Sequence, residues 1–164
     1  MSLKEKIDNI YSQIGNPQNG LPEEIFVFAT KITPMINVDL LVKDNDNSIL
    51  LSWRKTELSE GWHVIGGIIR LNETFEERIQ KTALNEIGTE VIFKPEPIAI
   101  KQLIHKELPY RSHFITLIYE CRLPESFIIN NQGKAEKDSG FLKWHKKYPE
   151  DMIKYHRFYK EYFS

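Results

Sequence analysis

The sequence has a single cysteine, almost no net charge and no long apolar run. Cys121 is the only cysteine among 164 residues, so an internal disulfide is impossible and a reducing compartment, the cytoplasm, is expected. The formal net charge is −1, which argues against nucleic acid or an anionic membrane as the main partner. No stretch approaches the length of a membrane span, and no signal peptide is expected at the N-terminus.

What is present fits one globular domain with a full core, because 41% of the residues are hydrophobic and 27% are charged. Apolar residues recur at helical spacing in residues 3–14 and again in residues 21–31, on either side of the turn sequence NPQNG at 16–20. We therefore predict an N-terminal helical extension over residues 1–32 and the main domain over residues 33–164.

Runs of β-branched and aromatic residues predict the strands of the main domain, which are expected over residues 36–42, 48–53, 90–93, 98–105, 114–121 and 141–144. The first two flank a polar turn at 44–47, which predicts a β-hairpin. Residues 151–163 carry an aromatic face and predict a C-terminal helix. Strands before and after a central helix, with a helix at the end, indicate an α/β (α+β) fold with a mixed sheet between helical layers.

The most informative stretch is Gly66–Thr89, which predicts a loop that tightens through Gly66–Gly67 and then a capped helix. Thr74 and Glu77 have the spacing of a capping box, and Gly88 is suited to a left-handed turn at the helix end. Apolar residues recur at every fourth position and are predicted to face the core: Ile79, Ala83 and Ile87.

This stretch resembles the Nudix box, Gly-x5-Glu-x7-Arg-Glu-U-x-Glu-Glu-x-Gly-U, in which U is a bulky aliphatic residue. Four positions match in register: Gly67, Glu73, Glu86 and Gly88. Four positions depart from the pattern: Lys81 replaces Arg, Thr82 and Asn85 replace the first two glutamates of the metal cluster, and Thr89 replaces the last aliphatic residue. The resemblance implies a Nudix-type α/β/α sandwich with a mixed β-sheet and a divalent cofactor, Mg²⁺ or Mn²⁺. Because only Glu86 keeps its charge, one metal is expected instead of a cluster.

Within the Nudix superfamily, the chain is most similar to the GDP-mannose mannosyl hydrolase branch, which also lacks the first two cluster glutamates. The resemblance implies four substrate-binding residues: Asp39, Arg54, Arg70 and Lys81. Arg70 lies two positions beyond the arginine of the branch, where this chain has Ile68. For Lys81, the residue types also favour an ion pair with Glu73 that braces the loop against the helix. A carboxylate at Asp39, inside an apolar strand, needs a partner.

By the same resemblance, the metal would be held by the Gly66 carbonyl, Glu86 and Asp138. The branch has a Gln-His pair, with the histidine as general base, where this chain has Asp138–Ser139. The proton acceptor is therefore expected to be Glu136 or Asp138, since a carboxylate with a tuned pKa can act as a base. His105 matches a histidine of the active-site strand, which completes the catalytic candidates.

The branch hydrolyses a nucleoside-diphosphate sugar by attack of water at the anomeric carbon, and the diphosphate leaves intact. The resemblance implies the same reaction here on a GDP-mannose-like nucleotide sugar, with the metal neutralising the leaving group. Two alternatives stay open: pyrophosphohydrolysis of a nucleoside-diphosphate derivative, and a nucleotide-sugar-binding module without turnover. The N-terminal extension and the aromatic C-terminal segment favour a homodimer.

Overall fold

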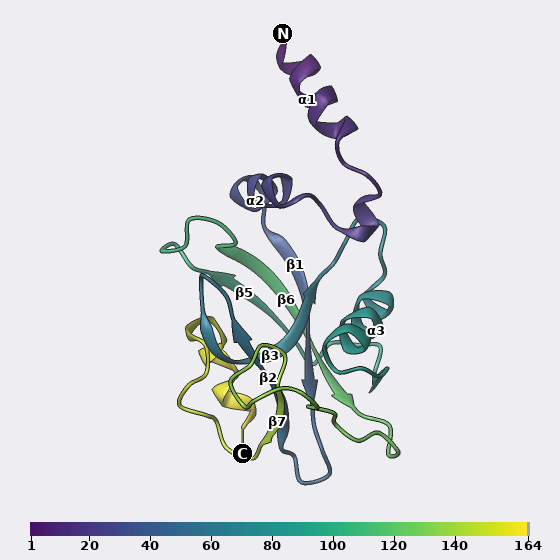
Figure 1. Cartoon of the computed structure of the whole chain (residues 1–164), viewed down its shortest axis with the longest axis vertical. Helices are drawn as coiled ribbons and strands as arrows, with labels where there is room; N and C mark the ends of the chain where they lie inside the picture. Colours follow the sequence, from purple (N-terminus) through teal and green to yellow (C-terminus); the bar gives the residue numbers. More distant parts are fainter. Residues whose placement is uncertain (164) are drawn as a thin grey trace.

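A computed structural model describes residues 1–163 as helices and 3-10 helices around one sheet (Figure 1). Its elements, with η for a 3-10 helix, are α1 (Leu3–Ser12), η1 (Pro17–Asn19), α2 (Glu23–Ile32), β1 (Met35–Val42), β2 (Ile49–Lys55), β3 (Glu60–Ile68), α3 (Phe75–Glu86), β4 (Ile92–Phe93), β5 (Ala99–Ile104), β6 (His113–Arg122), β7 (Leu142–His145) and η2 (Lys154–Tyr162). Among these helices, none within residues 1–163 has the length and apolar character needed to cross a membrane.

The seven strands form one mixed sheet in the order β4-β6-β1-β3-β2-β7, with β5 also paired to β6. β1 and β6 are parallel, and the other pairs are antiparallel. A parallel pair needs a long crossover, which here contains β2, β3, α3, β4 and β5. The predicted α/β (α+β) fold with a mixed sheet is therefore confirmed.

The predicted hairpin between the first two strands is wrong, because β3 lies between them. β3 pairs with β1 on one side, Asp39 opposite Gly66, and with β2 on the other, Leu51 opposite Val64. β1 and β2 meet at the bridge between Lys43 and Ile49, next to their connecting turn. A turn sequence predicts that two segments reverse direction, but a third strand can insert beyond the turn.

The predicted glycine loop is also wrong, because Gly66 and Gly67 lie inside β3. A side chain at Gly66 would collide with the carboxylate of Asp39, and one at Gly67 would collide with the hydroxyl of Thr82. The glycines therefore let β1 and α3 approach β3 closely, which is a packing role and not a turn. This close approach sets the distance between the box helix and the strands beside it.

Each face of the sheet has its own apolar core, as the alternation of side chains along a strand requires. One core joins the strands to α3 through its predicted inward face, Ile79, Ala83 and Ile87, and includes Cys121, which is fully buried. The other joins the strands to the C-terminal segment through Met152 and Tyr159.

The C-terminal helix predicted over residues 151–163 is present as a 3-10 helix, η2, over Lys154–Tyr162. Two of its aromatic pairs, His156 with Tyr159 and Tyr159 with Tyr162, are three residues apart, and three residues make one turn of a 3-10 helix. Tyr159 is fully buried and hydrogen-bonded to Asp39. The contacts of Tyr159 with the rest of the fold therefore decide that this segment is a 3-10 helix.

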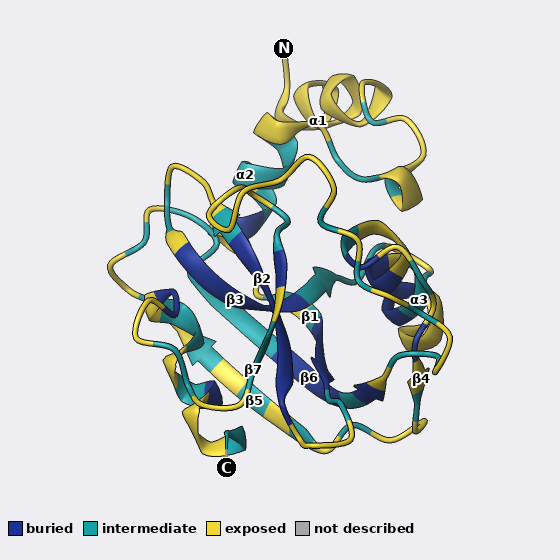
Figure 2. Ribbon diagram, turned by 60° about the horizontal axis from the view of Figure 1, so that its bottom comes forward, coloured by how far each residue is buried: buried dark blue, intermediate teal, exposed yellow. Residues whose placement is uncertain are grey.

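The N-terminal residues divide into two parts. α1 projects away from the sheet and has no buried residue (Figures 1 and 2). η1 and α2 lie closer, and Pro17, Phe26 and Ala29 line the main cavity of the protein. Part of the predicted extension over residues 1–32 thus contributes to the candidate site.

Candidate active site

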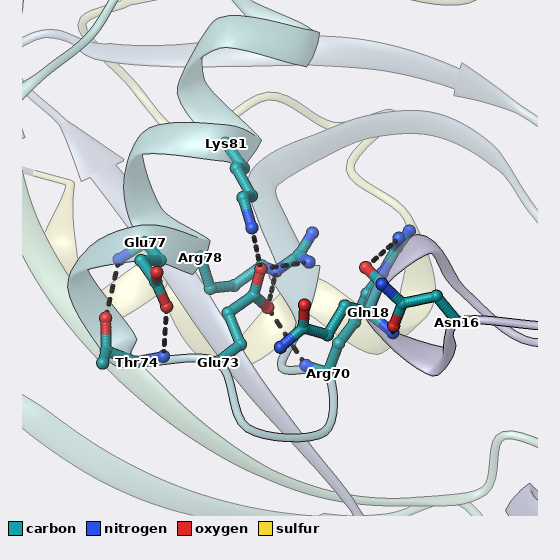
Figure 3. Close-up of polar contacts among 8 residues, drawn as sticks. All are labelled: Asn16, Gln18, Arg70, Glu73, Thr74, Glu77, Arg78 and Lys81. Carbon is teal, nitrogen blue, oxygen red and sulfur yellow. Dashed lines mark hydrogen bonds and ion pairs between the residues drawn. The ribbon is translucent and has the colours of Figure 1, made fainter.

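The box helix begins as the sequence predicts. Thr74 accepts a hydrogen bond from the Glu77 backbone, and the Glu77 side chain accepts one from the Thr74 backbone (Figure 3). After the helix, Gly88 has a positive φ of 94°. α3 therefore holds Glu86 in its last turn, where the helix is anchored to the sheet by its apolar face.

Glu73 braces the loop before α3 against the helix. Arg78 donates to both of its carboxylate oxygens at 2.6 and 2.8 Å, Lys81 at 3.0 Å, and the Arg70 backbone at 3.1 Å (Figure 3). Burial raises the pKa of Glu73, but these hydrogen bonds outweigh it and bring the pKa to about 2. The predicted ion pair between Glu73 and Lys81 is confirmed, and Arg78 is a stronger partner that the sequence pattern did not indicate.

Substituting Glu73 by alanine is expected to lower the free energy of unfolding by about 3 kcal/mol, because Arg78 would be left as a buried, unpaired charge. Urea unfolding followed by circular dichroism measures the change. Glu76→Ala, an exposed position of the same helical turn, serves as the control, with an expected loss below about 1 kcal/mol. Equal losses in both variants would contradict a bracing role for Glu73.

A cavity of about 690 Å³ opens beside β1, β3 and the N-terminal segment. This volume is within the range of about 300–1,000 Å³ that is typical of small-molecule sites. Five predicted residues line it: Asp39, Arg54, Gly66, Arg70 and His105. The lining also contains polar residues that the sequence did not single out, among them Arg111, Thr116 and His156. The structure thus brings together residues from five separate segments of the chain.

Two of the lining guanidinium groups, Arg54 and Arg111, have no ion-pair partner among residues 1–163. Burial, and then the positive charge of Arg54, lower the pKa of Arg111, so the two groups are near enough to repel each other. Arg111 has a left-handed backbone, with φ 55°, and its guanidinium lies 5.3 Å from the centre of the Phe26 ring of α2. Two guanidinium groups that form no ion pair at one cavity favour an anionic ligand.

Asp39 is the buried centre of a hydrogen-bond network. Asn37 donates to its Oδ1, and Thr116 and Tyr159 donate to its Oδ2. The network ties β1 to β6 and η2, and it supplies the partners that a carboxylate in an apolar strand requires. The pKa of Asp39 is raised to about 6, and burial is the largest cause. The hydrogen bonds from Thr116 and Tyr159 and the charge of Arg54 oppose this rise, whereas the charge of Glu86 adds to it.

The raised pKa of Asp39 predicts a pH dependence of stability. Between the ordinary value of 3.8 and about 6, the folded protein binds more protons than the unfolded chain. The stabilisation from this group is therefore present at low pH and is lost as the pH rises through 6. We expect the free energy of unfolding of the wild type, relative to Asp39→Asn, to fall by about 2 kcal/mol from pH 4 to pH 7.

Urea unfolding at a series of pH values tests this expectation. Asp46→Asn, at an exposed turn position, is the matched control and should follow the wild type over the whole range. A difference between wild type and Asp39→Asn that does not vary with pH would show that Asp39 is already ionised at pH 4.

Two histidines line the cavity. One can donate a hydrogen bond, and the other can accept a proton. The Val64 backbone donates to Nδ1 of His156 at 3.0 Å, so the neutral ring carries its proton on Nε2 and is a hydrogen-bond donor. His105 stacks edge-on against Tyr155 with ring centres 4.7 Å apart. Burial lowers the pKa of His105, which leaves a neutral imidazole that can accept a proton.

Glu86 contacts a third histidine that the sequence gave no reason to select. His63, on β3, places Nε2 at 3.3 Å from Oε2 of Glu86, and its Nδ1 lies 2.7 Å from the Ser52 carbonyl oxygen. Burial lowers the pKa of His63, whereas its hydrogen bond with Glu86 raises it. Glu86 is not among the described residues that line the cavity, but its charge raises the pKa of Asp39, which does line it.

The donor set near Glu86 fits one cation better than a cluster. Thr82 is buried against Gly67, with no hydrogen-bond partner for its hydroxyl among the described residues, so it is a helix–strand contact. Within residues 1–163, no group of three or more His, Cys, Asp or Glu side chains is arranged to hold a metal ion. A single divalent cation with Glu86 and few other protein ligands is compatible with these observations.

The remaining predicted residues lie elsewhere, and none of them is among the described residues that line the cavity. Glu136 pairs with Lys143 at 2.5 Å, and both side chains are exposed. Asp138 accepts a hydrogen bond from the Ala135 backbone at 2.7 Å within its own loop. Lys81 is occupied by Glu73. The roles of Glu136 and Asp138 as base and metal ligand stay predictions, as does the catalytic role of His105, which does line the cavity.

Comparison with known proteins gives little at the level of sequence. No family model matches the chain. A low-salt glycan biosynthesis protein, Agl8, from Haloferax volcanii is 28% identical over 81 residues, which are 49% of this chain and 51% of that protein. The match therefore spans about half the length of that curated relative.

Solved structures share the fold. The MutT protein from Methanosarcina mazei Go1 superposes with a TM-score of 0.60 at 16% identity, over 80% of this chain and 94% of that chain. A MutT Nudix hydrolase from Burkholderia pseudomallei gives 0.59 at 14%, over 80% and 99%. A UDP-X diphosphatase gives 0.55 at 18%, over 97% and 74%. The chain therefore has the fold of Nudix hydrolases, as its box-like stretch predicts.

Proposed function

We propose that the protein is a divalent-metal-dependent hydrolase of a nucleoside-diphosphate sugar that cleaves at the glycosyl carbon. The observation that carries the proposal is the pair of guanidinium groups, Arg54 and Arg111, on a cavity of about 690 Å³, neither of which forms an ion pair within the described part of the chain. A diphosphate matches that charge, and guanidinium groups bind phosphate oxygens with two parallel hydrogen bonds. The glycan-biosynthesis name of the partial relative supports a sugar nucleotide.

The reaction forms a bond from the water oxygen to the anomeric carbon and breaks the bond from that carbon to the diphosphate oxygen. The bonding electrons leave with the diphosphate, whose charge Arg54 and Arg111 stabilise. His105 accepts the proton of the attacking water, because its imidazole is neutral and faces the cavity. His156 donates from Nε2 to a substrate oxygen.

Glu86, with the Gly66 carbonyl, would hold one divalent cation, which supplies positive charge to the leaving diphosphate when bound. Thr82 and Asn85 stand where the box has glutamates, so two carboxylate ligands that a metal cluster would need are missing. Attack at carbon needs charge neutralisation of the leaving group, for which one cation is sufficient. The structural likeness to a UDP-X diphosphatase over most of this chain favours pyrophosphate cleavage as the second candidate.

Hydrolysis in ¹⁸O-labelled water separates these reactions. Purified protein with Mg²⁺ or Mn²⁺ is incubated with a panel of nucleotide sugars, and products are identified by phosphorus NMR and mass spectrometry. We expect an unlabelled nucleoside diphosphate and a free sugar that carries the label. Label in a phosphate product would establish pyrophosphate cleavage, and thermal stabilisation by a nucleotide sugar without any product would establish a binding module.

A further inference from the structure

The contact between His63 and Glu86 is the feature of the site that the resemblance does not account for. The His63 side chain is 3% exposed and that of Glu86 is 27% exposed, so the pair lies at the boundary between core and solvent. His63 is held on β3, four residues before Gly67, and Glu86 is held by the last turn of α3. Both ends of the contact therefore belong to rigid elements.

The hydrogen bond of His63 to the backbone defines which ring nitrogen is free. A carbonyl oxygen only accepts, so the 2.7 Å contact with the Ser52 oxygen requires a proton on Nδ1. In the neutral ring, Nε2 then presents a lone pair toward Oε2 of Glu86 at 3.3 Å. Two acceptors that face each other repel, so either a proton or a cation must lie between them.

The geometry of this contact is that of a metal-binding histidine. Histidines that bind metals typically donate their second ring N–H to a backbone carbonyl or carboxylate, which fixes the tautomer and aims the other nitrogen. His63 has this arrangement with Ser52, and a carboxylate stands beside its free nitrogen.

We propose that Nε2 of His63 and the carboxylate of Glu86 together bind one divalent transition-metal ion, such as Mn²⁺ or Co²⁺, in preference to Mg²⁺. An imidazole ligand suits first-row transition ions, whereas Mg²⁺ prefers oxygen ligands. The inference deepens the proposed function, since Glu86 serves both. It also explains how the site can lose the acids at positions 82 and 85: an imidazole takes over part of the ligand set.

Metal binding to the full-length protein, without substrate, tests the proposal. Isothermal titration calorimetry measures the affinity for Mn²⁺ and Mg²⁺, and pulsed EPR of bound Mn²⁺ detects the ¹⁴N coupling of an imidazole ligand. We expect one coupled imidazole in the wild type and a Kd for Mn²⁺ below that for Mg²⁺. Absence of ¹⁴N coupling would overturn the proposal, whatever any variant does.

His63→Asn is the variant of choice, because the asparagine amide can still donate to the Ser52 carbonyl while Nε2 is removed. We expect the imidazole coupling to disappear, the Kd for Mn²⁺ to rise at least about tenfold and the Kd for Mg²⁺ to change much less. His113→Gln, whose ring contacts Gln102 outside the cavity lining, is the matched control and should retain the coupling. Unchanged Mn²⁺ affinity in His63→Asn would show that a shared proton, and not a metal, occupies the contact.

The metal-site proposal and the proposed function can fail separately in these experiments. Imidazole coupling together with no product from any nucleotide sugar would support the metal site and refute the hydrolase. Release of nucleoside diphosphate without imidazole coupling would support the hydrolase and overturn the metal site.

Discussion

Replacing Glu86 by glutamine is expected to reduce metal-dependent turnover about 10³-fold, or about 4 kcal/mol in activation free energy. Glu86 is the only acid left at the three metal-cluster positions of the box, so the substitution removes the charge that holds the cation. The side chain is partly exposed in the last turn of α3, where a negative charge opposes the helix dipole. The amide keeps the shape, so the fold should be retained.

Steady-state kinetics at increasing Mg²⁺ or Mn²⁺ measure the effect, with circular dichroism and thermal unfolding as checks of folding. Glu90→Gln removes an exposed carboxylate just beyond the helix and is the matched control. Its turnover should equal that of the wild type. Hydrolysis by Glu86→Gln at the wild-type rate would show that the site described above is not the active site.

Replacing Arg54 by alanine is expected to weaken nucleotide-sugar binding by about 10- to 100-fold, since a hydrogen bond between charged groups contributes about 1.5–3 kcal/mol. Arg54 lines the cavity with Asp39 and Arg111, and among residues 1–163 it forms no ion pair that would hold its guanidinium group away from a ligand. Arg54→Lys keeps the positive charge but lacks the paired N–H donors of the guanidinium group, so an intermediate loss of binding affinity is expected.

Isothermal titration calorimetry with a nonhydrolysable nucleotide sugar measures the binding. Arg122→Ala removes an exposed arginine at the far end of β6 and should bind as the wild type does. The charge of Arg54 lowers the pKa of Asp39, so the Arg54→Ala variant should also show a higher pKa for that carboxyl in a carbon-13 NMR titration. A changed pKa with unchanged affinity would place Arg54 near the site but not on the ligand.

The order and type of most elements could be predicted from the sequence because the signals that specify them are local. The capping box of Thr74 and Glu77 joins residues three apart, and the inward face of α3 repeats at every fourth position. Periodicity likewise located the strands other than β3, although their ends shifted by one or more residues; β3 (Glu60–Ile68) was not predicted as a strand, because its polar start and its two glycines are typical of a loop. The ion pair of Glu73 with Lys81 spans loop and helix within eight residues.

The candidate site could be predicted only in part, because its residues come from segments that meet through strand pairing. Asp39, Arg54 and His105 were selected by resemblance, and the structure places them on one cavity. Arg111 and His63 carried no local signal, since an arginine in a loop and a histidine in an apolar strand are common. Their roles emerge only when the loop after β5 meets α2 and when β3 meets α3.

The sequence alone determined the box helix, its caps, the mixed α/β character and the need of Asp39 for partners. Tertiary structure decided that β3 lies between β1 and β2, that the C-terminal segment is a 3-10 helix and that His63 faces Glu86. The physical reason is the distance along the chain between the residues that specify each feature. Caps and periodicity depend on residues within a turn or two, whereas strand order and side-chain encounters depend on competition among distant segments for the same packing surface.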